Sequence, residues 1–219
     1  MKVLVATEKP FADIAVKKIR EVINDAGYEV TFLENYTSPS ELAATAADAD
    51  ALIVRSDIVS AQLLDAAKRL KIVVRAGAGY DNLDLEACSR NNVVAMNTPG
   101  QNSNAVAELA FEMMLYMVRG GFAGRSGTEL RGKTIGIHAF GNVGRYVAEI
   151  SLGFGMFPYA FDPFVPAEVM EKHGIKPCKK AEDLYSQCQF VSLHLPFNDE
   201  TGNSINYSLL SLMPPQAVL

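Results

Sequence analysis

The sequence of 219 residues predicts an α/β protein with two doubly wound parallel sheets. Three observations favour this fold class. Segments with strand patterns alternate with segments of helical periodicity, which is typical of βα units. The predicted strands are apolar almost throughout, as strands covered on both faces of a parallel sheet are. The alternation breaks near residues 97–104, so we expect one sheet on each side of that boundary.

The first pattern contains five predicted strands, which are Val3–Ala6, Glu29–Leu33, Ala51–Val54, Ile72–Ala76 and Val93–Met96. A helix of about 13 residues follows the first strand and carries apolar residues at helical spacing. These residues are Ile14, Ile19, Val22 and Ile23. Further helices are predicted after Ser38-Pro39-Ser40-Glu41, near Ala61–Lys68 and over Asp84–Asn91.

The second pattern opens with a long amphipathic helix over roughly Asn102–Arg119. We expect its apolar stripe to pack in the core, as Met-rich stripes commonly do. The stripe consists of Val106, Leu109, Ala110, Met113, Met114 and Met117. After a glycine-rich connection at 120–127, the remaining predicted elements are strand Thr134–Ala139, helix Arg145–Leu152, a strand ending at Asp162, helix Ala181–Ser186, strand Phe190–Leu195 and helix Tyr207–Leu212.

Composition limits the classes of partner. A hydrophobic content of 49% with 21% charged residues predicts a soluble globular chain. The net charge of −5 argues against nucleic-acid and anionic-membrane partners. The chain shows no signal-peptide core and no apolar run of about 20 residues. Its three cysteines and three histidines lack metal-ligand spacing and fit a reducing compartment, so we expect a cytoplasmic protein without a metal.

The segment from Lys133 to Asp162 has the order of a dinucleotide-binding βαβ unit. An apolar strand ends in a turn whose residues Phe140, Gly141, Asn142, Val143 and Gly144 we expect to contact a cofactor. Gly141 lets the backbone approach a pyrophosphate, and Gly144 lets helix and strand pack closely. The helix N-terminus supplies free N–H groups for the phosphates. A tight strand–helix turn without a ligand is the alternative interpretation.

Two further residues of this unit set the expected cofactor preference. Asp162 follows Gly144 by 18 residues, at the end of the second strand. A carboxylate there accepts both ribose hydroxyls and repels a 2′-phosphate, which favours NAD over NADP. Ala139 stands at the first glycine position of the fingerprint, and we expect its methyl group only to crowd the turn.

Two segments of the first pattern are candidates for binding an anion. Arg55 and Ser56 follow a predicted buried strand, and the carboxyl ends of such strands face the ligand crevice of an open sheet. A guanidinium there grips a phosphate bidentately. The loop Arg75-Ala76-Gly77-Ala78-Gly79 follows the next strand and exposes amides in a nest-like turn. The alternatives are an unliganded surface arginine and an ordinary glycine turn.

Several motifs together resemble the D-isomer-specific 2-hydroxyacid dehydrogenases. They are K-T-I-G-I-H-A-F-G-N-V-G-R, F-D-P-F, V-S-L-H-L-P-F-N-D-E-T, L-L-S-L-M-P-P-Q-A-V-L, V-R-A-G-A-G-Y-D-N-L-D and N-T-P-G-Q-N-S-N-A-V-A-E-L-A. The resemblance covers nearly the whole chain. Within the family it is closest to the short members that oxidise 3-phospho-D-glycerate and lack a C-terminal regulatory domain.

The resemblance implies a flavodoxin-like substrate domain at 1–98 and a Rossmann NAD-binding domain at 99–219, with the site in the cleft between them. It assigns the substrate carboxylate to Arg75, Gly77 and Ala78, and the phosphate to Arg55 and Ser56. Asn102 matches a substrate-contacting asparagine and is equally an N-cap candidate. His194 and Pro196, with Thr201, match the adenosine-side wall. Relatives are commonly homodimers through the nucleotide domain.

The same resemblance places the family's catalytic arginine, glutamate and histidine beyond Leu219, so no catalytic residue is assigned within the chain. Ala217-Val218-Leu219 looks like the opening of another buried strand. We therefore expect a chain truncated at its C-terminus, with an incomplete nucleotide domain and no turnover by itself. The expected activity of the intact protein is oxidation of 3-phospho-D-glycerate, a small anionic 2-hydroxy acid, in serine biosynthesis. The alternatives are a glyoxylate or hydroxypyruvate reductase and a non-catalytic NAD-binding corepressor-like protein.

Overall fold

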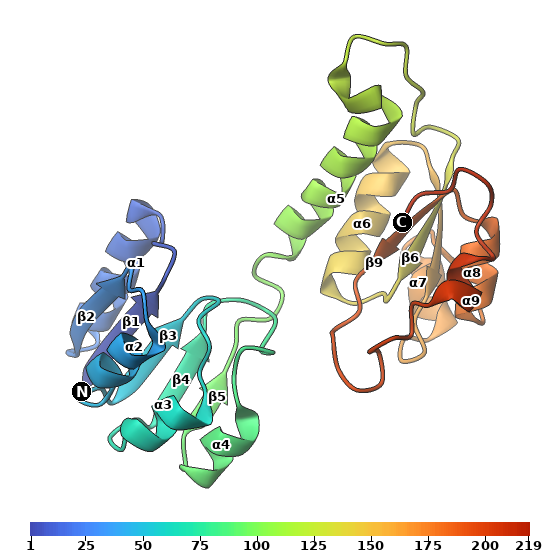
Figure 1. Cartoon of the computed structure of the whole chain (residues 1–219). Coiled ribbons are helices and arrows are strands. Elements are labelled where there is room, and N and C mark those ends of the chain that lie inside the picture. The colour runs from blue at the N-terminus through green and yellow to red at the C-terminus, as the bar shows by residue number, and fades with distance from the viewer. The chain divides into compact units, whose positions relative to one another are not determined.

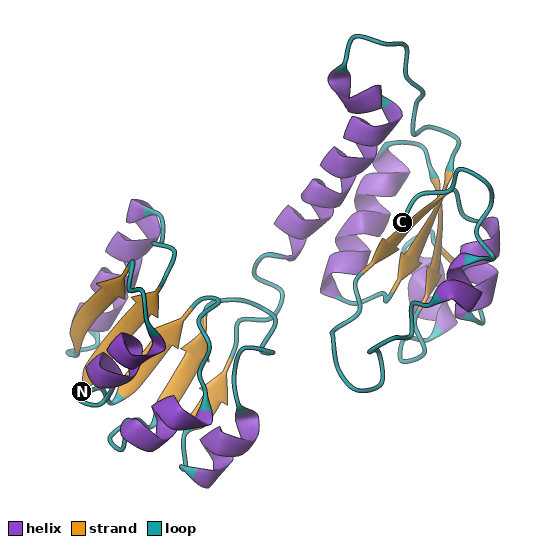
Figure 2. Cartoon of the chain, viewed as in Figure 1, coloured by secondary structure: helices purple, strands orange, loops and turns teal.

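A computed structural model describes all residues from Met1 to Leu219. The chain divides into two compact units, Met1–Gln101 and Asn102–Leu219 (Figure 1). This division lies three residues beyond the predicted boundary at 98/99, because Asn102 begins the helical turn that leads into the second unit. Each unit is an α/β layer structure with its own parallel sheet, which confirms the predicted fold class (Figure 2).

The first unit has a five-stranded parallel sheet in the order β2-β1-β3-β4-β5, which is the flavodoxin-like order. Its strands are β1 (Lys2–Thr7), β2 (Glu29–Glu34), β3 (Ala51–Val54), β4 (Ile72–Arg75) and β5 (Val94–Met96). Its helices are α1 (Asp13–Asp25), α2 (Pro39–Ala46), α3 (Ala61–Ala66) and α4 (Leu85–Arg90).

Helices cover both faces of this sheet, and each face has its own cluster of buried side chains (Figure 1). On one face, α1 contributes Ile23 against Val3 and Val5. On the other face, α2, α3 and α4 pack Leu42, Leu64 and their neighbours against Leu52. Side chains at the helix starts fix the boundaries: Ser38, Ser60 and Asp84 each accept a hydrogen bond from a first-turn amide.

The second unit has a four-stranded parallel sheet in the order β8-β7-β6-β9, which corresponds to strands 3-2-1-4 of a Rossmann fold, one mononucleotide-binding half and one further strand. Its strands are β6 (Thr134–His138), β7 (Phe157–Phe161), β8 (Lys176–Pro177) and β9 (Phe190–Leu193). Its helices are α5 (Ser103–Val118), the 3₁₀ turn η1 (Gly120–Phe122), α6 (Asn142–Gly153), α7 (Ala167–Lys172), α8 (Ala181–Gln187) and α9 (Tyr207–Leu210).

Figure 1 shows α5 beside α6, and together they bury Phe111, Val147 and Ala148 against the sheet. On the opposite face, α8 and α9 pack Leu184, Tyr185 and Leu209 against β9. Val218 forms a parallel bridge with Phe190, so the chain returns to the sheet beside β9. The predicted strand opening at residues 217–219 therefore pairs with the sheet through Val218, although Ala217 and Val218 are only partly buried and Leu219 is exposed.

Burial differs from expectation in two segments of the first unit. Ile14 and Val22 of α1 are largely exposed, because only one narrow side of this helix meets the sheet. Val94 and Met96 of β5 are exposed, because β5 is the edge strand of its sheet. The sequence pattern also did not predict α7 and β8, which are too short for a periodic signal and lack a side-chain cap.

The Met-rich stripe of α5 was expected in the core, but only part of it is buried. Ala110 and Met114 pack against the unit, as do Ala107 and Phe111, which were not assigned to the stripe. The residues of the neighbouring stripe of α5 are exposed and line an apolar groove of about 460 Å³ beside β9. These exposed residues are Val106, Leu109, Met113 and Met117. The helix carries two adjacent apolar stripes, and periodicity alone does not tell which one faces the sheet.

Candidate functional site

The carboxyl ends of β3 and β4 lie next to each other in the first sheet and carry two arginines. Arg55 follows β3, and Arg75 is the last residue of β4, paired in register with Val54. The Arg75 guanidinium donates from Nε to the carbonyl oxygen of Arg55 at 3.0 Å. No ion pair of the protein includes Arg55 or Arg75. The edge therefore presents two guanidinium groups whose charge is not neutralised by an acidic side chain.

The Arg75 guanidinium lies directly against Gly77. A Cβ atom at Gly77 would lie 1.7 Å from Nη1 of Arg75, so any other residue would displace the guanidinium. The Gly77 amide is also used inside the loop, where it donates to the carbonyl oxygen of Arg75 at 2.9 Å. Gly77 thus shapes the loop. Its N–H group is already hydrogen-bonded within the loop, whereas the sequence predicted that it is available for the substrate carboxylate. The next amides, of Ala78 and Gly79, donate to no protein acceptor and remain available for an anion.

Neighbouring groups hold the rest of this loop. The Asn97 side chain donates to the carbonyl oxygen of Ala78 at 2.7 Å, and the Thr98 amide donates to that of Gly77 at 2.9 Å. Ser56 is exposed beside Arg55. In the first unit the structure therefore brings together Arg55, Ser56, Arg75, Gly77 and Ala78 at adjacent strand ends.

Asn102 belongs to the second unit, where it immediately precedes α5. Asn102 occupies the N-cap position as the alternative interpretation expected, but its side chain is exposed and makes no capping hydrogen bond. Only its carbonyl oxygen takes part in the helix start, where it accepts from the Val106 amide at 3.1 Å.

The glycine turn between β6 and α6 has the geometry that dinucleotide binding needs. Gly144 packs directly on the end of β6, because a Cβ there would lie 2.3 Å from the carbonyl oxygen of Ala139. Around Gly141 no atom lies within 4 Å of an added Cβ, so the backbone is open to a ligand. The first amides of α6, from Asn142 to Gly144, have no acceptor within the helix. The turn is therefore suited to an anionic group.

Asp162 stabilises this turn from the end of β7. Its Oδ2 accepts from the Phe140 amide and its Oδ1 from the Phe164 amide, each at 2.8 Å. The carboxylate thus fixes the loop on both sides of the turn while each oxygen keeps a second lone pair for a ligand. The structural contact to Phe140 was not predicted from the spacing of Asp162.

A pocket of about 350 Å³ lies beside Asp162 and contains two of the predicted adenosine-side residues, Pro196 and Thr201. The Thr201 hydroxyl donates to the Pro196 carbonyl oxygen and accepts from the Asn198 amide, so it closes the loop that walls the pocket. His138, Phe164 and Leu195 also line this pocket and were not predicted from the sequence. A polar residue at the end of an apolar strand was the available signal for His138.

His138 is buried and its Nδ1 lies 3.1 Å from the hydroxyl of Tyr185. Burial lowers the pKa of His138 and outweighs the nearby Asp162 carboxylate, which acts in the opposite direction. Burial raises the pKa of Tyr185 to about 12, so this hydroxyl keeps its proton. The pair is therefore neutral at physiological pH.

His194 lies apart from this pocket, on the apolar groove beside α5. Its Nε2 is 2.9 Å from the Ser192 hydroxyl, and burial lowers its pKa to about 4. Its backbone amide donates to the His138 carbonyl oxygen at 2.9 Å. The structure thus connects His194 to the end of β6 through its backbone and does not place its side chain among the residues that line the Asp162 pocket.

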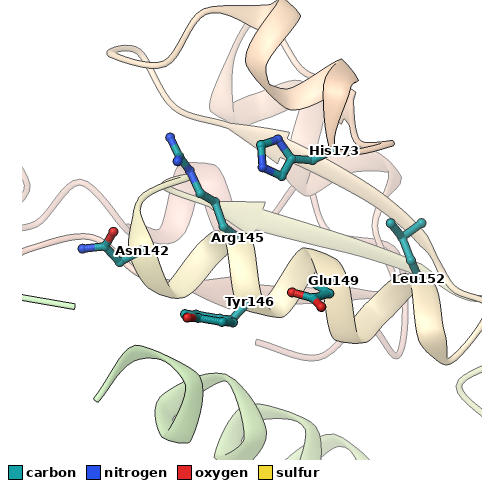
Figure 3. A pocket seen from close by; sticks show the side chains of 6 residues that line it. All are labelled: Asn142, Arg145, Tyr146, Glu149, Leu152 and His173. Atoms are coloured by element: carbon teal, nitrogen blue, oxygen red, sulfur yellow. The ribbon is translucent and has the colours of Figure 1, made fainter. Parts of the chain in front are cut away.

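A further hollow of about 360 Å³ lies on the outer side of α6. Figure 3 shows that Arg145 and His173 point to the same side of this helix, with Tyr146 and Glu149 along its length. Asn142 is the only predicted cofactor residue that lines it. Apart from His194, the predicted cofactor residues therefore lie at the Asp162 pocket or in the glycine turn.

No group of three or more His, Cys, Asp or Glu side chains is arranged to hold a metal ion. None of the helices has the length and apolar character to span a bilayer.

Comparison with known proteins extends these observations. Pig (Sus scrofa) D-3-phosphoglycerate dehydrogenase is 37% identical over 207 residues, which cover 88% of this chain and 38% of the relative. The hydroxypyruvate reductase of Thermotoga maritima is 32% identical over 212 residues, which cover 90% of this chain and 67% of the relative. The chain therefore spans less than half the length of the mammalian relative.

A crystal structure of NAD⁺-bound 3-phosphoglycerate dehydrogenase from Entamoeba histolytica superposes with a TM-score of 0.93 at 46% identity. The superposition covers 100% of this chain and 70% of that one. A family model, D-isomer specific 2-hydroxyacid dehydrogenase, catalytic domain, matches residues 5–192. The chain belongs to the D-isomer specific 2-hydroxyacid dehydrogenase family.

Proposed function

We propose that this chain supplies the substrate-binding and NAD-binding parts of an enzyme that oxidises 3-phospho-D-glycerate to 3-phosphohydroxypyruvate in serine biosynthesis. The observation that carries the proposal is the pair of arginines at the carboxyl edge of the first sheet, Arg55 and Arg75, with no acidic partner. The similarity to the pig and Entamoeba phosphoglycerate dehydrogenases supports it.

The substrate is a dianionic phosphate joined to a carboxylate, and the first unit offers a group for each. Arg55, assisted by Ser56, binds the phosphate, because a guanidinium matches two phosphate oxygens at once. The free amides of Ala78 and Gly79 bind the carboxylate in the manner of a backbone nest. Arg75 adds positive charge between the two groups, and Asn102 is a proposed further substrate contact.

The second unit fits NAD. The α6 amides and the open backbone at Gly141 receive the pyrophosphate, and Asp162 accepts the ribose hydroxyls. The negative charge of Asp162 disfavours the 2′-phosphate of NADP. The Pro196–Thr201 loop walls the adenosine side. NAD held by these residues would supply the acceptor for the hydride that leaves the substrate C2. No residue of this chain is assigned the transfer of the hydroxyl proton, so the tests are binding measurements.

The cofactor assignment is tested with Asp162→Asn, measured by calorimetric titration with NAD and NADP. The amide keeps the size of the side chain and one acceptor oxygen but removes the charge. We expect NAD to bind about 10-fold more weakly, the loss of one hydrogen bond to a charged group. The affinity for NADP should rise relative to the affinity for NAD. An unchanged preference between the two cofactors would remove Asp162 from the ribose site.

The substrate assignment is tested with Arg55→Ala, titrated with 3-phosphoglycerate and with unphosphorylated D-glycerate. We expect a loss of about 10- to 100-fold for the phosphorylated ligand only, because a charge-assisted contact contributes about 1.5–3 kcal/mol. Arg90→Ala is the matched control, since Arg90 is an exposed arginine of the same unit at the end of α4. Equal losses for both ligands would remove Arg55 from the phosphate role.

A further inference from the structure

Asp57 is a buried carboxylate beside the proposed phosphate site. It lies three residues after the end of β3, and its side chain is 5% exposed although its neighbours Ser56 and Ile58 are exposed. No lysine or arginine forms an ion pair with it. A carboxylate in such a position is costly unless hydrogen bonds replace its lost hydration.

Three donors replace that hydration. Oδ1 accepts from the Glu8 amide and from the Tyr36 hydroxyl, each at 2.7 Å. Oδ2 accepts from the Arg55 amide at 3.1 Å. Burial and the hydrogen bond to Asp57 raise the pKa of Tyr36, so the hydroxyl remains a donor. Both oxygens are therefore engaged by the protein itself.

The donors come from segments that follow three adjacent strands. Glu8 follows β1, Tyr36 follows β2 and Arg55 follows β3, and these strands are neighbours in the sheet. A fourth segment joins through the backbone, because the Asn82 side chain donates to the Asp57 carbonyl oxygen at 2.7 Å. One residue thus ties together the loops at the edge of the sheet where ligands of open α/β sheets bind.

Arg55 is held on both sides by this arrangement. Its amide donates to Asp57, and its carbonyl oxygen accepts from Nε of Arg75. The Asp57 carboxylate therefore fixes the backbone from which the Arg55 guanidinium extends, and that backbone in turn fixes the Arg75 guanidinium. Neither guanidinium is bonded to the Asp57 carboxylate, so both keep their charge for a ligand.

We infer that Asp57 is a positioning residue that sets Arg55 and Arg75 for the phosphate of the substrate, an inference that rests on the proposed function. Asp57 contacts no ligand in this role. Tyr36 serves the same role through its hydroxyl, which holds the carboxylate in place.

The variant that isolates this role is Asp57→Asn. Its single side-chain oxygen has two donors to satisfy at the Oδ1 position, so the amide nitrogen faces the Arg55 N–H, to which it cannot act as acceptor. The variant therefore breaks the Arg55 contact with little change in volume. Tyr36→Phe is a second, milder variant that removes one donor, and it keeps the inference testable if Asp57→Asn does not fold.

Asp50 provides the matched control. It lies immediately before β3, at the opposite end of the same strand, and is also buried, with 8% exposure. It accepts from the Lys2 amide at 2.8 Å and from the Arg69 guanidinium at 3.4 Å. Asp50→Asn thus perturbs a buried carboxylate of the same sheet, but at the edge away from Arg55.

The experiment is calorimetric titration of each variant with 3-phosphoglycerate and D-glycerate, together with hydrogen exchange of the Arg55 amide followed by NMR. For Asp57→Asn we expect faster exchange at Arg55 and affinity for the phosphorylated ligand reduced about 10-fold, as for one lost hydrogen bond to a charge. D-Glycerate affinity should change much less. Tyr36→Phe should lower the ratio of 3-phosphoglycerate affinity to D-glycerate affinity in the same direction. Asp50→Asn should leave this ratio unchanged.

An Asp57→Asn variant with the same ligand ratio and the same Arg55 exchange as Asp50→Asn overturns the inference. If Arg55→Ala still binds 3-phosphoglycerate more weakly in that case, the proposed phosphate site is supported without a positioning role for Asp57. If the unsubstituted protein does not prefer 3-phosphoglycerate over D-glycerate, the proposed function fails and the positioning role fails with it.

Discussion

Ala139 shows how one side chain changes the energy of the nucleotide turn. Its φ is +78°, in the left-handed region that costs an L-residue about 1–2 kcal/mol. The turn keeps its geometry because Asp162 and Gly144 hold it on either side. The motif spacing singled out Asp162 and Gly144, and the structure places both against this turn. It did not predict the backbone strain at Ala139, because spacing carries no information about φ.

We therefore expect Ala139→Gly to stabilise the second unit by about 0.5–1 kcal/mol, since relief of strain exceeds the entropy that glycine adds to the unfolded chain. Urea unfolding measures this as a higher midpoint. Ala105→Gly, in the helical backbone of α5, should have the opposite sign. A lower midpoint for Ala139→Gly would show that the turn does not adopt the left-handed conformation in solution.

His194 makes stability depend on pH. Burial lowers its pKa from 6.5 to about 4, so the folded state binds the proton more weakly than the unfolded chain. The stabilising contribution of neutral His194 is complete above about pH 6.5 and is lost as the pH falls towards 4. Between pH 7.5 and 5.0 we expect this contribution to the free energy of unfolding to fall by at most about 2 kcal/mol.

The measurement is urea unfolding at those two pH values for the unsubstituted protein and for His194→Gln. The variant should lose less stability on acidification than the unsubstituted protein does. His173→Gln serves as the control, because His173 is exposed at the end of α7. We expect this variant to lose as much stability on acidification as the unsubstituted protein does. Equal acid losses in the unsubstituted protein and His194→Gln would assign the pH dependence to other groups, among them His138.

At the scale of the element, α5 shows what periodicity predicts and what it does not. Its length and boundaries followed from the sequence, because a run of 16 residues gives a strong helical signal. The buried side did not, since apolar residues occupy two adjacent stripes of the helix. Short elements such as α7 gave no signal, and they form because the surrounding unit buries Met170. Tertiary packing therefore decides what local sequence leaves open.

Two neighbouring methionines of α5 test which stripe is buried in solution. Met114 is 7% exposed and packs in the core of the second unit, whereas Met113 is 55% exposed. We expect Met114→Ala to cost about 2–4 kcal/mol and Met113→Ala less than about 0.5 kcal/mol in urea unfolding. A large, concentration-dependent cost for Met113→Ala would contradict this and would indicate that a second copy covers the stripe, as the expected homodimer would allow.

At the scale of the whole molecule, the sequence predicted two parallel sheets, and their strand orders agree with the two halves of the expected architecture. This was predictable because right-handed βαβ crossovers leave few ways to order consecutive strands. The location of the proposed anion-binding edge was also predictable, since it is set by strand ends. The network around Asp57 was not, because its donors come from residues as far apart in sequence as Glu8 and Arg55.

The two units have separate cores, and this has a measurable consequence. Leu52 is fully buried in the cluster of the first unit and Ile137 in that of the second, and the clusters share no residue. Replacing either by alanine leaves a cavity and costs about 2–5 kcal/mol in the unit that contains it. Because unfolding of a chain with two cores is not a single two-state transition, the loss should be local.

Hydrogen exchange measured along the whole chain tests this expectation. Leu52→Ala should raise exchange within residues 1–101 and leave the β6 and α6 amides protected, and Ile137→Ala should do the reverse. The two substitutions control for each other, since each removes a fully buried branched side chain from a central strand. Faster exchange in both units with either variant would mean that the chain unfolds as one cooperative unit, and Arg55 and Asp162 would then depend on a shared stability instead of on two separate ones.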